Sequence, residues 1–150
     1  MRRSIAALPL LLALTVTPAW GDSSPPAAVP ATPAPTPERY YNDGFEYQKR
    51  KDFRRAARAF QEAITLRESY AEAWNGLGYA LRQQGRYPDA VRAYERALAL
   101  RPAYAEAIEY LGEAYVQMVR LDDARAMLRR LEPLDPAEAG KLRAAIEAKK

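Results

Sequence analysis

Three glutamates of this sequence, Glu106, Glu109 and Glu113, have the spacing of residues on one face of a helix. Carboxylates in such a row could act as general acid and base in a hydrolase, or could bind a basic segment or a free amine. Two-carboxylate chemistry needs a pair held across the substrate, and these acids stand on one helix with no facing acid. We therefore favour binding over catalysis, and a solvated helix face without any ligand is a third interpretation.

The composition removes most other catalytic chemistry. The 150 residues, a length that predicts one domain, contain no cysteine and no histidine. Thiolate nucleophiles, disulfides, imidazole bases and the usual zinc ligands are therefore absent, and we expect neither a metal nor a cofactor. The formal net charge is +4, from 23 basic and 19 acidic residues, and it is +2 (23 minus 2 basic residues) without Arg2 and Arg3. This small excess gives no reason to expect a nucleic-acid ligand.

The N-terminus has the features of an export signal. Arg2 and Arg3 precede an apolar stretch over residues 5–16, and small residues follow at the positions that determine cleavage. We expect residues 1–21 to be a signal peptide cut after Gly21, or alternatively after Ala19, and the mature protein to be periplasmic without a stable membrane span. The alternative is an uncleaved N-terminal anchor, although the stretch is short and contains prolines. Residues 22–36, rich in proline and alanine, are expected to be a disordered linker.

From residue 37 to residue 138 the sequence repeats with a fixed period of 34 residues. The recurring residues are Gly44, Gly78 and Gly112; Ala56, Ala90 and Ala124; and Pro102 and Pro136. The period predicts one supersecondary unit stacked three times, over residues 37–70, 71–104 and 105–138. Within each unit the apolar spacing predicts two helices. In the second unit Gly85 would end the first helix, and Pro88 would lie in the first turn of the next.

The middle unit resembles the tetratricopeptide repeat family. It has Trp74, Leu77 and Gly78 in the first helix, with Leu81 where tyrosine is usual. The further matching residues are Ala90, Tyr94, Ala97 and Pro102. The resemblance implies an all-α fold, a right-handed α-solenoid of three helix-turn-helix units.

The two ends of the array differ from its middle. Asp43 and Glu68 depart from the family pattern, so we expect the first unit to be the least stable part of the domain. At the other end Leu142 and Ile146, spaced i and i+4, predict a capping helix over residues 137–149 that covers the third unit.

Small residues are expected where helices approach one another closely. We expect Gly78 to face Ala90 within one helix pair and Gly112 to face Ala124 in the next, so that a larger side chain would push the helices apart. On this basis Gly78→Leu should destabilise the protein strongly, and Gln84→Leu should not.

In this family the first helices of successive units line a concave surface that binds peptides, and the resemblance implies such a groove here. The inward-facing positions are Tyr41, Phe45 and Lys49 in the first unit, Asn75, Tyr79 and Arg82 in the second, and Glu106, Glu109 and Glu113 in the third. Three glutamines share these faces: Gln48, Gln83 and Gln117. The groove would be aromatic at one end, polar in the middle and acidic at the other, which suits a peptide with an apolar anchor and a basic segment. Alternatively, Tyr41 and Phe45 pack against the proline-rich segment.

One subclass of the family, the co-chaperones, grips a C-terminal carboxylate with lysine, arginine and asparagine side chains. The corresponding positions in this chain hold no cation; they are Tyr41, Phe45, Gly76, Glu106 and Tyr110. We therefore do not expect a ligand of that kind.

The function predicted from the sequence is a non-enzymatic interaction scaffold of the bacterial cell envelope that binds a protein or peptide partner. The alternative is a self-assembling structural subunit whose open repeat ends stack between chains, which would make the protein an oligomer. A carboxylate-based enzyme is the least favoured interpretation.

Overall fold

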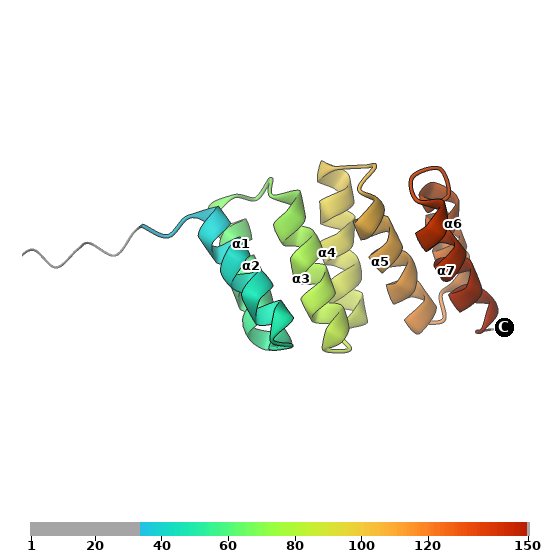
Figure 1. Ribbon diagram of the computed structural model, residues 1–150, viewed down its shortest axis with the longest axis horizontal. Coiled ribbons are helices and arrows are strands. Elements are labelled where there is room, and N and C mark those ends of the chain that lie inside the picture. Colours follow the sequence, from blue (N-terminus) through green and yellow to red (C-terminus); the bar gives the residue numbers. More distant parts are fainter. Residues whose placement is uncertain (1–33, 150) are drawn as a thin grey trace, which may run out of the picture. The chain divides into compact units, whose positions relative to one another are not determined.

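The computed structural model describes residues 34–149, and every regular element in this range is an α-helix. The predicted signal peptide and the predicted linker up to residue 33 lie outside the described residues. The helices are α1 (Pro37–Lys49), α2 (Phe53–Leu66), α3 (Ala71–Gln83), α4 (Tyr87–Leu100), α5 (Ala105–Gln117), α6 (Leu121–Leu131) and α7 (Pro136–Glu147). They stand side by side in a row from α1 to α7 (Figure 1). The all-α solenoid predicted from the period is therefore confirmed. Within residues 34–149, no helix is both long enough and apolar enough to cross a membrane.

Side chains at the N-cap positions fix where three of the helices begin. Thr36 accepts a hydrogen bond from the amide of Arg39 at 3.1 Å, and Asp52 accepts one from the amide of Arg55 at 3.1 Å. Asp135 caps α7 in the same way by accepting from two amides of its first turn. Proline occupies one of the first two positions of α1, α4 and α7, where its missing N–H leaves no helical bond unmade.

The turn between the two helices of each unit requires a left-handed backbone. Gly85 ends α3 as predicted and has φ +74°, a conformation that glycine adopts without steric cost. Lys51 and Val119, one 34-residue period before and after it, have φ +58°. A β-branched residue is strained in this region, and Val119 is 64% exposed, so little packing offsets the strain. In two of the three units the turn therefore keeps its left-handed backbone, although the residue at that position disfavours a positive φ.

The first helices of the units form one layer and the second helices form another. Helix α1 contacts α3, α3 contacts α5, and α5 contacts α7. Over the described residues, α2, α4 and α6 do not contact one another, and each packs against the helices before and after it. A stack whose first helices lie closer together than its second helices must curve, and the layer of first helices is then on the concave side.

Glycines of the first helices allow close approach, as predicted, but the side chains that approach them are not the expected ones. A Cβ added to Gly78 would lie 2.6 Å from the ring of Tyr94, which is fully buried. A Cβ added to Gly44 would lie 2.8 Å from the ring of Phe60. The expected partner of Gly78, Ala90, is fully buried but does not supply these nearest atoms, because its side chain is too short to fill the space beside a glycine.

The third unit uses the capping helix for the same purpose. A Cβ added to Gly112 would lie 2.6 Å from Leu142 of α7 and 3.3 Å from Met127 of α6, and not against the expected Ala124. Leu142 is 2% exposed and Ile146 is 3% exposed, so α7 covers the end of the third unit with the two residues that the sequence singles out.

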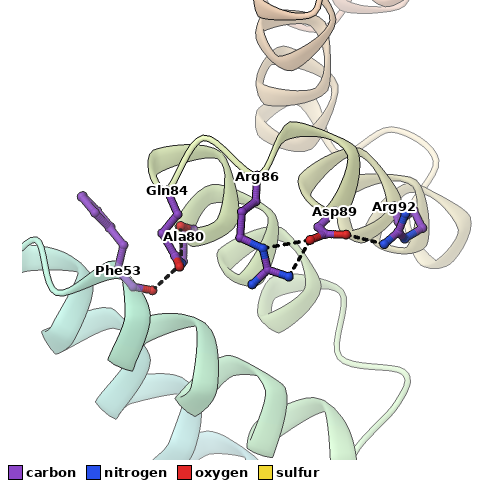
Figure 2. A network of polar contacts seen from close by, with 6 residues as sticks. All are labelled: Phe53, Ala80, Gln84, Arg86, Asp89 and Arg92. Atoms are coloured by element: carbon purple, nitrogen blue, oxygen red, sulfur yellow. Dashed lines mark hydrogen bonds and ion pairs between the residues drawn. The ribbon is translucent and has the colours of Figure 1, made fainter.

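Gln84 is not the neutral position expected from the sequence. Its Nε2 donates hydrogen bonds to the carbonyl oxygen of Phe53 at 3.0 Å and to that of Ala80 at 2.9 Å (Figure 2). The first bond joins the second unit to α2 of the first unit, so Gln84→Leu would leave a carbonyl between the units without this donor. Figure 2 also shows Asp89 at the start of α4 between Arg86 and Arg92, which pair with it on either side.

Glu68, which replaces the closing proline of the first unit, ties this unit to the second. Its carbonyl oxygen accepts a hydrogen bond from Nε1 of Trp74 at 2.8 Å, and its carboxylate pairs with Arg96 of α4. The hydrogen bond uses a backbone carbonyl that proline also has, whereas the ion pair with Arg96 requires the glutamate side chain.

We expect Gly78→Ala to lower the free energy of unfolding by about 2 kcal/mol, because the added Cβ would overlap the buried ring of Tyr94. Gly140→Ala is the matched control, since a Cβ there meets nothing within 4 Å inside α7. It should raise stability by up to about 1 kcal/mol through helix propensity. Urea unfolding followed by circular dichroism measures both, and equal midpoints for the two variants would contradict the packing described.

Candidate functional site

A small pocket opens on the concave layer, between α1, α3 and α5. Its volume is about 50 Å³, and Phe60 of α2 lies among its lining residues. Five of the nine predicted groove residues line it: Tyr41, Phe45, Asn75, Tyr79 and Glu106. The other four, which are Lys49, Arg82, Glu109 and Glu113, lie outside this lining and have partners of their own.

Aromatic rings follow one another along the concave layer. The ring of Tyr41 lies 5.7 Å from that of Phe60 and 5.2 Å from that of Tyr70. The ring of Tyr79 lies 5.4 Å from that of Tyr110 in the next unit. These separations are typical of favourable aromatic pairs. Tyr41 is therefore held by packing within the domain.

Phe45 is the aromatic residue of the pocket that remains available to a ligand. Phe45 is 44% exposed, although it is a large hydrophobic residue and lines the pocket. Lys49 lies over its ring, with Nζ 4.7 Å from the centroid, and pairs with Glu46 at 2.7 Å. Lys49 therefore flanks the pocket from the C-terminal end of α1.

Arg82 and Glu113, two of the predicted groove residues, neutralise each other. They form an ion pair at 2.6 Å, in which the side chain of Arg82 is only 15% exposed. The guanidinium also stacks between the rings of Tyr79, at 5.4 Å, and Tyr110, at 5.2 Å. The acidic end predicted from the sequence thus loses one of its three free carboxylates to a contact between the second and third units.

Glu109 has a facing acid, contrary to the expectation from the sequence. Helix α7 brings Glu138 against it, and Lys141 pairs with Glu138 at 2.6 Å. Burial, followed by the charges of Glu138 and Glu113 and a hydrogen bond with Glu138, raises the pKa of Glu109 to about 7. The residue spacing within α5 could not predict this pair, because Glu138 comes from α7.

Two amide side chains of the pocket carry buried oxygens without a hydrogen-bond partner. Asn75 is 4% exposed, and its Nδ2 donates to the hydroxyl of Tyr104 at 3.4 Å, while its Oδ1 has no partner. Oε1 of Gln48 is likewise buried without a partner. Buried acceptors are nearly always satisfied in folded proteins, so these two oxygens need a donor from outside the domain, either water or a ligand.

An ion pair inside each of the first two units repeats with the sequence period. Glu38 at the start of α1 pairs with Arg67 at the end of α2, and Glu72 at the start of α3 pairs with Arg101 at the end of α4. Both glutamates lie 29 residues before their arginines. These pairs connect the beginning of each unit to its end.

The third unit breaks this pairing. The glutamate is kept as Glu106, but Asp135 stands at the position of the arginine and caps α7 instead. No ion pair joins Glu106 to a cation within residues 34–149, and the groups near its carboxylate are the hydroxyls of Tyr104, at 3.5 Å, and of Tyr110. An unpaired carboxylate is thereby placed at the pocket.

Sequence reasoning did not assign Glu72 and Tyr104 to the groove, and it considered Tyr110 only as a position that corresponds to the co-chaperone subclass. A signal for two of them was present. Tyr104 lies 34 residues after Tyr70, and Tyr110 lies four residues after Glu106, one helical turn along the same face. The burial of these rings also shows in their acidity, since burial and then the charge of Glu106 raise the pKa of Tyr104 to about 12.

Two family models match the sequence. One, described as TPR repeat, matches residues 78–119, and the other, described as tetratricopeptide repeat, matches residues 46–93. The sequence matches no curated protein.

Solved structures share the fold. The TPR domain of Arabidopsis OM64 is 21% identical, with 76% of this chain and 96% of that chain covered and a TM-score of 0.72. The TPR2B domain of yeast Sti1, in a complex with pHsp70, is 19% identical, with 76% and 98% covered and a TM-score of 0.73. The second TPR domain of human RPAP3, with the HSP70 peptide SGPTIEEVD, is 19% identical, with 74% and 98% covered and a TM-score of 0.68. At these identities the likeness concerns the fold.

We expect Glu109→Gln to raise the melting temperature at about pH 8 and to leave it nearly unchanged at about pH 4. The pKa of Glu109 in the folded protein lies above its ordinary value. The stability that its protonation contributes is therefore present at low pH and lost as the pH rises through about 7. Because Glu109 is only partly buried, solvent screening reduces the expected gain to about 1 kcal/mol.

The matched control is Glu147→Gln, an exposed position on the same capping helix, which should show no gain at either pH. A gain for Glu109→Gln that is as large at low pH as at high pH would show that the effect is not electrostatic.

Proposed function

We propose that this chain, which belongs to the tetratricopeptide repeat family, is a non-enzymatic protein-interaction module whose concave layer binds a segment of a partner polypeptide. The observation that carries the proposal is the pair of buried, unpartnered oxygens of Gln48 and Asn75 in a pocket beside the exposed ring of Phe45. A polypeptide supplies donors to such oxygens through its backbone or side-chain N–H groups, and an apolar side chain to such a ring.

The ligand we propose differs from that of two structural neighbours. The yeast Sti1 domain is in a complex with pHsp70, and the human RPAP3 domain holds a peptide ending in the acidic sequence EEVD. The corresponding positions of this chain hold no cation that could grip a carboxylate, and Glu106 would repel one. The fold supports the binding of a peptide, and the side chains of the groove favour a peptide without a cluster of negative charges.

The arrangement of the carboxylates argues against a glycoside hydrolase. In the described part of the chain, Glu109 and Glu138 face each other and share a hydrogen bond. The two catalytic carboxyl groups of a glycoside hydrolase stand at least about 5 Å apart so that a substrate bond fits between them. The contact between Glu109 and Glu138 leaves no such gap.

For the location of the module we propose the periplasm, with the partner in the cell envelope. The support is the sequence of residues 1–21, which has the charged start, apolar stretch and small residues of an export signal. Mass spectrometry of the protein from a periplasmic fraction should give an N-terminus at Asp22. Intact protein confined to the cytosolic fraction would contradict export, and intact protein in the membrane fraction would favour the uncleaved anchor.

The interaction is tested by affinity capture from an envelope extract with the wild-type protein and with Phe45→Ala. We expect Phe45→Ala to reduce the amount of captured partner at least tenfold, because the exposed ring is an anchor of the size that dominates binding energy. Leu66→Ala is the matched control, since Leu66 is 48% exposed, close to the 44% of Phe45, but does not line the pocket. If Phe45→Ala and Leu66→Ala capture the same partners in the same amounts, the proposed binding face is wrong.

A further inference from the structure

The polar atoms that lack partners in the pocket are acceptors. Oδ1 of Asn75 and Oε1 of Gln48 are buried and unpartnered, and the carboxylate of Glu106 has the hydroxyls of Tyr104 and Tyr110 beside it but no ion pair. Asn75 is 4% exposed, so bulk water has little access to this oxygen. An occupant that satisfies all three groups must offer several donors, as an ammonium or a guanidinium group does.

The charge of the pocket has one sign. Its lining includes two carboxylates, from Glu72 and Glu106, and no lysine or arginine. Glu72 is neutralised by Arg101. The position equivalent to Arg101 in the third unit is Asp135, so Glu106 has no such partner. The carboxylate of Glu106 therefore leaves an unbalanced negative charge at the rim of the pocket. Because the pocket is partly desolvated, this charge attracts a cation more strongly than it would in open water.

The cations that approach the lining rings are already committed to carboxylates. Lys49 lies over the ring of Phe45 and pairs with Glu46. Arg82 stacks on Tyr79 and pairs with Glu113, and Arg101 stacks on the ring of Tyr104 while pairing with Glu72. None of these three cations can move to Glu106 without giving up its own ion pair. The missing positive charge must then come from outside the chain.

We propose that this pocket takes the cationic end of a side chain of the bound partner, a lysine ammonium or an arginine guanidinium, at Glu106 and Asn75. The cation bonds to the carboxylate of Glu106 and donates to Oδ1 of Asn75, while the apolar stem lies against Phe45. A volume of about 50 Å³ suits one side-chain end and excludes a folded segment. This assignment rests on the proposed function, because it names the ligand group for the same face.

Titration of the isotope-labelled protein with capped tripeptides tests the assignment by NMR. The probes are Gly-Lys-Gly and Gly-Arg-Gly, with Gly-norleucine-Gly and Gly-citrulline-Gly as neutral counterparts of similar shape. We expect saturable shifts of the Asn75 and Gly76 amides with a cationic probe, at a Kd of about 1 mM, which is reasonable for one side chain. The neutral counterpart should bind at least tenfold more weakly, and the two cationic probes show which of the two side chains fits better.

Glu106→Gln should weaken binding of the cationic probe at least tenfold, since it keeps the shape and removes the charge. Glu147→Gln makes the same change on an exposed face of α7 and should leave the Kd unchanged. The assignment is overturned if neutral and cationic probes bind equally, if Glu106→Gln has no effect, or if no cationic probe shifts these amides at about 10 mM.

The two proposals fail in different ways. If the cationic probes show no preference while Phe45→Ala still abolishes capture of the partner, the interaction module stands and the cation site is wrong. If Phe45→Ala leaves capture unchanged while the cationic probes bind through Glu106, the pocket binds cations but is not the face that holds the partner.

Discussion

The ring of Phe60 lies between two glycines of neighbouring units, and this contact sets the spacing on which the concave layer depends. A Cβ would lie 2.8 Å from the ring at Gly44 of α1 and 2.7 Å at Gly76 of α3. The ring, at 1% exposure, therefore brings two first helices together across one second helix. Phe60 also lines the pocket, so the contact that joins the first two units also shapes the site. Glycine in a helix costs stability, and the domain keeps it where a side chain would force the units apart.

The site arises where the repeated pattern changes. Glu38, Glu72 and Glu106 occupy the same position of successive units, and the first two have arginine partners at the ends of their units. Asp135 replaces the third arginine because the chain continues there into a capping helix that needs an N-cap. Capping α7 and leaving Glu106 without an arginine partner are thus two consequences of one residue.

The period of the sequence was sufficient to predict the helices, their order, the turn at Gly85 and the burial of Leu142 and Ile146, because these follow from local spacing. Contacts between units could not be predicted in the same way. The pairing of Arg82 with Glu113, and of Glu109 with Glu138, depends on distances between helices that the spacing along one helix does not contain. The atoms nearest to Gly78 and Gly112 were not predicted either, because the length of the opposing side chain decides which atom reaches a glycine.

The central claim is that the layer of first helices is the binding face, and hydrogen exchange of the protein with its captured partner tests it most directly. The account predicts slower exchange on binding for amides of residues 37–49, 71–83 and 105–117, with the largest change near Asn75. Residues 53–66, 87–100 and 121–131 should exchange as in the free protein. Protection confined to these second helices, with the first helices unchanged, would contradict the account.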